Sequence, residues 1–381
     1  MPFEFTEAQE LLQWEVRDFA CKEIAPGARE RAKQEIPPRE MLKKIAEKGF
    51  NAINIPEEYG GRPGDWVSVG IVVEELSRAD FSAGGAVVMP QLTHILLGGR
   101  KELHREWLPQ VIKSDKHTCF CVTEPGCGSD VAAMRVRAKR DGDTYVLNGE
   151  KTSVSGGLWA DVAYVFAKTD DAAGLKGINV FLVPLDLPGI TRSRIPDMGF
   201  KPYGRASIFM DNVRVSMQNI LLKEGGGFYT IMQAFDWFRL VLSLQALGAA
   251  AASLNEAAEY AKKRTAFGKP IALFQGVAFK IAEDATLLEA ARLMCYKTLW
   301  LRDKGVPHTK ETAMCKWWCP QVAVRTIHNA MLIHGHGGYG EEYPIAQRLW
   351  DVIGYEIADG TAEIQKIIIS REIMGKDFTP S

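Results

Sequence analysis

The sequence has almost no excess of charge of one sign. Its 381 residues include 46 basic and 47 acidic side chains, a formal net charge of −1. Nucleic acids and acidic membranes bind surfaces on which Lys and Arg are clustered, and this balance gives no sign of such a surface. We therefore expect a small or locally charged ligand and no nucleic-acid partner.

Long hydrophobic runs, an apolar leader and paired cysteines are also missing. The most apolar stretch, residues 240–254, is too short to span a bilayer and contains Ser and Gln. The first ten residues are polar and acidic, unlike a signal or transit peptide. The seven cysteines lack the paired spacing of a zinc site, which favours reduced thiols. These features predict a cytoplasmic protein without membrane insertion.

The pattern of apolar residues divides the chain into three parts. Residues 1–118 have helical spacing, 119–224 contain short β-branched runs, and 225–381 return to long helices. Asp141-Gly142-Asp143 and Asn148-Gly149-Glu150 predict hairpin turns in the middle part. We expect an α+β fold with an N-terminal α-helical domain, a small antiparallel middle β-domain and a C-terminal four-helix bundle.

Two segments far apart in the sequence point to chemistry. Residues 123–130 (TEPGCGSD) combine two glycines with Ser and Thr, which lets a backbone approach a phosphate or a flavin closely and donate hydrogen bonds. Asp359 precedes Gly360 at a turn before a helical stretch, and presents a carboxylate there. An Asp before Gly is often only a turn or cap residue. Together, however, the segments suggest a cofactor cradle and a base.

Four motifs in a fixed order resemble the acyl-CoA dehydrogenase family over nearly the whole chain. They are residues 121–130, Asn148-Gly149-Glu150-Lys151, residues 264–268 (RTAFG) followed by Phe274-Gln275, and Asp359-Gly360-Thr361. The resemblance implies an FAD-dependent enzyme that removes hydrogens from Cα and Cβ of a CoA thioester. It also implies a homotetramer of three-domain subunits and an electron-transfer flavoprotein as the electron acceptor.

The resemblance implies roles for individual residues. Asp359 takes the position of the base that removes the α-proton. The positions matching FAD contacts near the flavin or its pyrophosphate are Phe120, Val122, Thr123, Gly128, Ser129, Ser153, Ser155 and Thr361. Those matching the adenosine half, held across a subunit interface, are Arg264, Phe267, Gln275, Leu332, Gly335 and His336. Those matching substrate contacts are Gln91, Ser129, Asp236, Arg239, Ala358 and Gly360.

The base and its neighbour depart from the family pattern. Asp359 stands where most members have Glu, Ala358 stands where Tyr is common, and the alternative location of a Glu base holds Phe238. Two shorter side chains at one wall enlarge the acyl pocket. We therefore expect an alicyclic or branched acyl group, for example that of cyclohexanecarboxyl-CoA.

Positions that match cofactor contacts also differ from the family pattern. Ser153 replaces a Trp found in many members, and Ser155 replaces a customary Thr. Leu332 and His336 replace a Gln and a Gly in the turn that contacts the ADP portion. We expect these changes to alter the solvent access and redox potential of the flavin and its ADP contacts.

Other interpretations of single residues stay open at the level of sequence. Asp236 and Arg239 also fit a surface i,i+3 ion pair, and Arg264 fits a helix-dipole partner. Gln91 also fits ordinary helix packing. The two histidines at 334 and 336 lack acidic neighbours, which favours loop packing over a metal site.

Other functions also stay open. The same site can run in reverse as an enoyl-CoA reductase. A nitroalkane-oxidase-like flavoenzyme shares an Asp base but pairs it with an Arg, where this sequence has Lys366. A non-catalytic CoA-binding protein is the third alternative.

Overall fold

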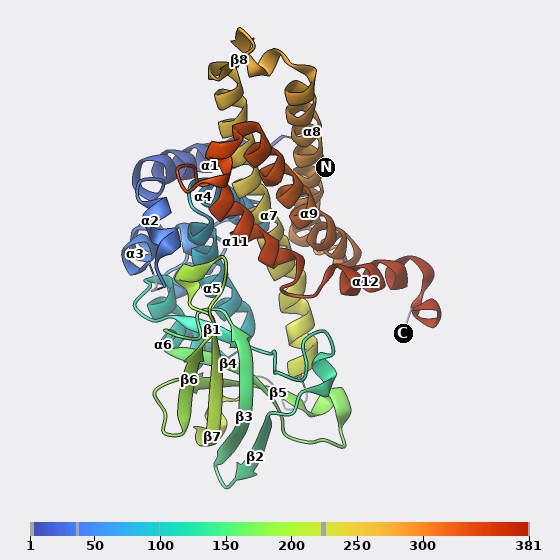
Figure 1. Cartoon of the computed structure of the whole chain (residues 1–381). Coiled ribbons are helices and arrows are strands. Elements are labelled where there is room, and N and C mark those ends of the chain that lie inside the picture. Colours follow the sequence, from blue (N-terminus) through green and yellow to red (C-terminus); the bar gives the residue numbers. More distant parts are fainter. Residues whose placement is uncertain (1–3, 36–37, 99, 222–225, 380–381) are drawn as a thin grey trace.

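The computed structural model describes residues 4–35, 38–98, 100–221 and 226–379. The predicted order of helices, strands and helices is confirmed (Figure 1). The β-domain forms one end of the molecule, and the C-terminal helices rise from it beside the N-terminal helices. The predicted boundary at residues 224 and 225 lies outside the described ranges.

The N-terminal part is helical, as its apolar spacing predicts. Thr6 caps the first helix in a capping box, and its side chain accepts a hydrogen bond from the backbone N–H of Gln9 at 3.3 Å. The principal helices are α1 (Glu7–Phe19), α2 (Ala28–Lys33), α3 (Arg39–Glu47), α4 (Trp66–Ala79), α5 (Phe81–Leu97) and α6 (Lys101–Ile112). Helices α4 and α5 are buried on almost all sides.

The middle domain is a mixed sheet, so the expectation of a purely antiparallel sheet was wrong. Its strands are β1 (Thr118–Cys121), β2 (Arg137–Asp141), β3 (Thr144–Val154), β4 (Val162–Lys168), β5 (Ile178–Pro184), β6 (Ile190–Arg194) and β7 (Ala206–Ser216). Strands β1 and β2 pair with β4 in parallel. Each reaches β4 through a long connection, which permits parallel pairing where a short hairpin does not.

One of the two predicted hairpin turns is real. Asp141-Gly142-Asp143 joins β2 to β3, and Asp141 pairs with Thr144. The turn predicted at Asn148-Gly149-Glu150 was wrong, because β3 runs through it with a register shift against β7 between Leu147 and Gly149. The backbone of Gly149 has φ +131°, and a Cβ atom there would meet a methyl group of Val136 at 2.9 Å. Gly149 therefore permits a β-bulge at this position of β3.

The C-terminal part consists of long helices, as its apolar spacing predicts. They are α7 (Gly227–Lys263), α8 (Gln275–Asp303), α9 (Thr309–His334) and α12 (Ala362–Met374), with α10 (His336–Tyr339) and α11 (Ile345–Ile353) between the last two. A two-stranded hairpin, β8 (Thr265–Ala266) and β9 (Lys269–Pro270), joins α7 to α8. Helix α12 extends away from the body (Figure 1).

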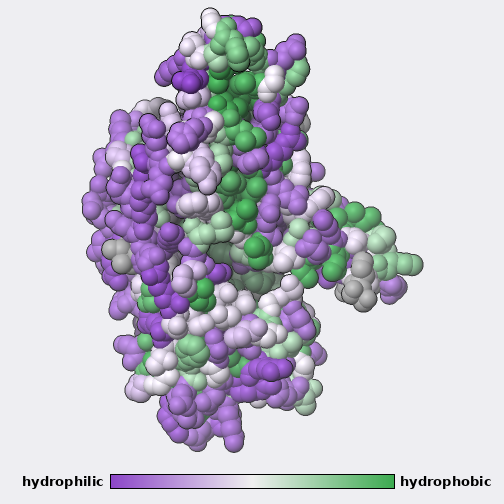
Figure 2. Space-filling model, viewed as in Figure 1, coloured by the Kyte–Doolittle hydropathy of each residue, from purple (hydrophilic) through white to green (hydrophobic). Residues whose placement is uncertain are grey.

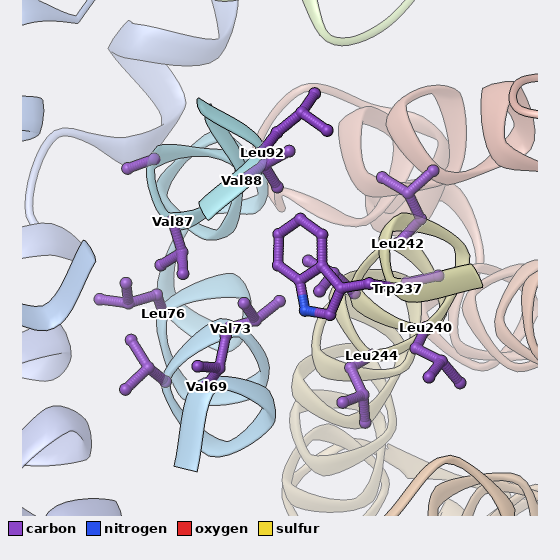
Figure 3. Packing of buried hydrophobic residues seen from close by; sticks show 14 of the residues in the cluster. Val69, Val73, Leu76, Val87, Val88, Leu92, Trp237, Leu240, Leu242 and Leu244 are labelled. Atoms are coloured by element: carbon purple, nitrogen blue, oxygen red, sulfur yellow. The ribbon is translucent and has the colours of Figure 1, made fainter. Parts of the chain in front are cut away.

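Helix α7 ties the N-terminal and C-terminal helices together. Its Trp237 is fully buried and lies between Val73 of α4 and Val88 of α5 (Figure 3). By length and composition α7 can cross a membrane, but 78% of its most apolar window is buried within the protein, as in a core helix. Anchoring at Trp237 fixes the neighbouring Phe235 and Arg239, which belong to the site.

Candidate active site

A buried ion pair fixes the loop that follows β1. The Lys151 ammonium donates to a carboxylate oxygen of Glu124 at 2.8 Å and to the Val122 carbonyl oxygen at 2.9 Å. The Lys151 side chain is 0% exposed and that of Glu124 is 5% exposed. Glu124 also accepts a hydrogen bond from the backbone N–H of Val136 at 3.0 Å. Two sequence motifs, 121–130 and 148–151, are therefore joined inside the protein.

This loop leaves room for a ligand. A Cβ atom added at Gly126 or Gly128 would meet no atom within 4 Å, and Ser129 is exposed beside them. The Thr123 carbonyl oxygen accepts a hydrogen bond from the Thr152 N–H at 2.9 Å, which brings the loop against the end of β3, where Ser153 lies and Ser155 follows. Open backbone and exposed hydroxyls fit the phosphates and ring of a flavin nucleotide.

Asp359 lies on a strained turn before α12. Its backbone has φ +56°, and that of Gly360 has φ +98°. The N-cap of α12 is Thr361, so Asp359 is a turn residue but is not the helix cap. A Cβ atom at Gly360 would lie 2.5 Å from the side-chain nitrogen of Gln365, so the turn requires glycine there.

Two buried cations hold the turn through its backbone. The Lys316 ammonium donates to the carbonyl oxygens of Tyr355 at 2.6 Å and Gly360 at 3.3 Å. The Arg239 Nε donates to the carbonyl oxygen of Asp359 at 3.0 Å. Three backbone oxygens around the carboxylate are thus fixed, while within the described ranges no hydrogen bond to the carboxylate itself is present.

Compared with water, the protein environment of Asp359 favours the protonated carboxyl group over the carboxylate. Burial raises the pKa of its carboxyl group to about 6, against the opposing charges of Lys316 and Arg239. A carboxylate with this pKa is ionised at neutral pH and is a stronger proton acceptor than a solvated aspartate. The side chain is half-buried, and the Ala358 beside it is exposed.

A chain of contacts joins the β1 strand to this turn. The ring of Phe120 lies 5.9 Å from the ring of Phe235 on α7, measured between centroids. The Arg239 guanidinium, one turn further along α7, lies over the Phe235 ring at 5.1 Å and also binds Asp359. The predicted cofactor strand and the predicted base are therefore connected through α7.

The residues predicted to line the substrate channel differ in their surroundings. Asp236 and Arg239 form an i,i+3 ion pair at 3.9 Å, but their side chains are only 20% and 7% exposed, so it is not a surface pair. Asp236 also accepts a hydrogen bond from the Thr309 hydroxyl at 2.7 Å. Gln91 is fully buried and donates to the Ile53 carbonyl oxygen, which makes it a packing residue of α5.

The residues predicted to hold the adenosine half lie at the other end of the molecule. Arg264, Phe267 and Gln275 are exposed at the β8–β9 hairpin, far from β1 in Figure 1. Tyr260 near the end of α7 stacks on His334 at 4.3 Å, which places the turn with exposed Leu332, Gly335 and His336 near the same end. Within one chain these six residues do not join the Thr123 loop.

Sequence reasoning missed Lys316 and the structural role of the Glu124–Lys151 pair. The signal for Lys316 is a lone lysine on a helix face that also holds Thr312, Cys315 and Cys319, all buried. The signal for Lys151 is a lysine at an inward position of a strand. A buried charged group needs a partner that compensates its charge or accepts its hydrogen bonds. The partners of Lys316 lie in the turn at Asp359, and the partners of Lys151 lie in the Thr123 loop.

The fold has three parts, and its site combines a loop of the β-domain that leaves room for a ligand with a carboxyl group of raised pKa before α12. The acyl-CoA dehydrogenase N-terminal, middle and C-terminal domain models match residues 6–115, 119–213 and 225–374. The chain belongs to the acyl-CoA dehydrogenase family.

The similar proteins are named for different reactions and substrates. The 3-(aryl)acrylate reductase of Clostridium sporogenes is 38% identical, covering 97% of this chain and 99% of that protein. The mitochondrial short-chain specific acyl-CoA dehydrogenase of Mus musculus is 36% identical, covering 97% and 91%. The butyryl-CoA dehydrogenase structure of Megasphaera elsdenii superposes with a TM-score of 0.93 at 32% identity, covering 98% and 100%.

The family fixes the reaction class and the cofactor. The chain is an FAD-dependent oxidoreductase that acts on the CH–CH group of a CoA thioester. The residues around the Thr123 loop fit FAD, because the Gly126 and Gly128 backbone is open and hydroxyl groups surround it.

Proposed function

We propose that this enzyme oxidises an alicyclic or branched acyl-CoA thioester, such as cyclohexanecarboxyl-CoA, to its 2,3-unsaturated product, with Asp359 as the base. The observation that carries the proposal is the turn itself. Asp359 has a raised pKa and a fixed backbone, and the exposed Ala358 adds only a methyl group to the wall beside it. A bulky acyl group fits such a wall better than a slim chain does.

The chain's own groups suffice for the proton-transfer step. The Asp359 carboxylate accepts the α-proton, which is acidified as negative charge develops on the thioester oxygen. The backbone N–H of Asp359 has no partner within the described ranges, so it is free to donate a hydrogen bond to that oxygen. FAD, when bound, supplies the acceptor for the hydride that leaves Cβ.

The remaining site residues take supporting roles in this proposal. Thr123, Ser129, Ser153, Ser155 and Thr361 contact the flavin side of the cofactor, next to Phe120, Val122 and Gly128. Asp236 and Arg239 line the CoA channel, and Gly360 contacts the substrate. Gln91 then acts by supporting α5 from its buried position.

A panel of thioesters tests the substrate. Holoenzyme is mixed anaerobically with cyclohexanecarboxyl-CoA, a branched thioester, butyryl-CoA and octanoyl-CoA, and flavin bleaching is followed. The cyclic or branched thioester is expected to bleach the flavin fastest. Faster bleaching by either straight chain would rule out the proposed acyl group while leaving the family assignment intact.

Reduction is the second candidate function. A relative at 38% identity is named a 3-(aryl)acrylate reductase, and another, from Anaerotignum propionicum, is named an acryloyl-CoA reductase (NADH). The same base then delivers a proton to Cα instead of removing one. Redox titration measures the flavin potential of the holoenzyme, once with the saturated thioester bound and once with its enoyl product bound. Comparing the two potentials shows which direction of the reaction is favoured.

Assembly as a homotetramer in the cytoplasm, with an electron-transfer flavoprotein as acceptor, completes the proposal. Apolar side chains gather on the exposed face of the C-terminal helices (Figure 2). Large exposed apolar residues of the C-terminal part include Phe267, Leu273, Phe279, Leu332, Ile357, Ile373 and Met374. Such a surface is typical of a subunit interface, and light scattering of the holoenzyme measures the expected mass of four chains.

A further inference from the structure

Three thiols meet in the core between α8 and α9. Cys315 and Cys319 lie one turn apart on α9, and Cys295 faces them from α8. All three are free and 0% exposed, and their sulfur atoms lie within 4.8 Å of one another. The sulfurs of Cys295 and Cys319 are 3.5 Å apart. This cluster is distinct from the residues that the dehydrogenation reaction uses.

The spacing matches a three-coordinate metal–thiolate site. Thiolate sulfurs lie about 2.3 Å from a bound d¹⁰ ion, so three of them in a plane around it are about 4 Å apart. The observed separations, 3.5 Å for one pair and at most 4.8 Å for all, bracket that value. Little side-chain movement is therefore needed to bind an ion.

The ligand set selects the class of ion. Among the described residues the cluster contains no His, Asp or Glu ligand, so a structural zinc ion would lack its fourth ligand. Soft thiolate ligands select Cu(I), which accepts three of them.

We propose that Cys295, Cys315 and Cys319 form a binding site for a soft monovalent d¹⁰ cation of the Cu(I) class. Binding forms three metal–sulfur bonds, and each ligating thiol gives its proton to solvent. No electron is transferred, so no oxidant or reductant is required. Because α8 and α9 are bridged directly, the bound ion stabilises their packing.

Chelator competition tests this site. FAD-loaded protein carrying Cys21→Ser, which removes the exposed thiol, is incubated anaerobically with the Cu(I) complex of a coloured chelator until uptake is constant. The buried pair Cys119 and Cys121, whose sulfurs are 3.9 Å apart, provides the matched control. Cys119→Ala removes a buried thiol outside the cluster. Cys295→Ala, Cys295→Ser and Cys319→Ala each remove one ligand.

The background protein and Cys119→Ala are expected to take up one equivalent of Cu(I) and to gain thermal stability from it. The three cluster variants are expected to lose at least about tenfold in affinity, since even outer-shell changes cost that much, and to gain no thermal stability. The serine variant nearly preserves size, which separates ligand loss from misfolding. No uptake by the background protein, or equal uptake by the folded cluster variants, would overturn the proposal.

Discussion

The Arg239 Nε lies 3.0 Å from the carbonyl oxygen of Asp359, so a buried cation on α7 holds the backbone of the proposed base without bonding its carboxylate. The same guanidinium lies over the ring of Phe235, whose neighbour Phe120 belongs to β1, the proposed cofactor strand. Arg239 therefore fixes the backbone of Asp359, and after Lys316 it is the second positive charge that opposes the effect of burial on the pKa of this carboxyl group.

Replacing Arg239 is expected to misplace the base. Arg239→Gln removes the hydrogen bond to the turn, and kcat/KM falls by about a hundredfold, as expected for a displacement of about 1 Å. Loss of a nearby positive charge also moves the pH midpoint of the remaining activity upward. Steady-state kinetics across pH checks both effects. Arg140→Gln, at an exposed position of β2, is the control and keeps the parental profile.

The pH dependence of the parent enzyme follows from the raised pKa of Asp359. Only the ionised carboxylate accepts a proton, so kcat/KM falls as pH decreases through about 6, the pKa of this group. At higher pH the rate reaches a plateau as far as this group is concerned. A profile that stays flat across that midpoint would show that another group takes the proton.

The buried Lys151 is expected to contribute strongly to stability. Lys151→Met leaves the Glu124 carboxylate buried without its partner, and the free energy of unfolding falls by about 3–5 kcal/mol. Lys139→Met on the exposed face of β2 changes it by only about 0.5 kcal/mol. Urea unfolding followed by circular dichroism measures both. Similar midpoints for the two variants would contradict the role assigned to the ion pair.

Enlarging the side chain at position 358 is expected to change substrate choice. Ala358→Tyr narrows the wall beside Asp359, so the ratio of kcat/KM for the cyclic thioester to that for butyryl-CoA falls by about 10- to 200-fold. Ala173→Tyr, at an exposed position of the β-domain, leaves this ratio unchanged. An unchanged ratio in Ala358→Tyr would show that this wall does not contact the acyl group.

Much of the fold was predictable because the long helices have strong apolar periodicity and clear ends. The sheet was less predictable. Parallel pairing of β1 with β4 depends on contacts between distant segments, and the signal at Asn148-Gly149 is the same for a hairpin and for a bulge. Local sequence cannot separate those outcomes, since neighbouring strands decide them.

For the proposed site, the motifs pointed to Asp359 and the Thr123 loop, but the groups that hold them could be found only in the three-dimensional structure. Lys316 and Arg239 act on backbone carbonyl oxygens that lie at least 39 residues away in the sequence, so no local pattern predicts these contacts. Cys295 joins Cys315 and Cys319 only because α8 and α9 pack side by side. The sequence alone shows the pair on α9 without its third member.

The most direct test of the central claim is anaerobic flavin bleaching by the best thioester in Asp359→Asn. The amide keeps the size of the side chain but cannot accept the α-proton, so the bleaching rate is predicted to fall by about 10²- to 10⁴-fold while FAD stays bound. Glu363→Gln, at an exposed position in the first turn of α12, is the control. Bleaching of Asp359→Asn at the parental rate would contradict the account.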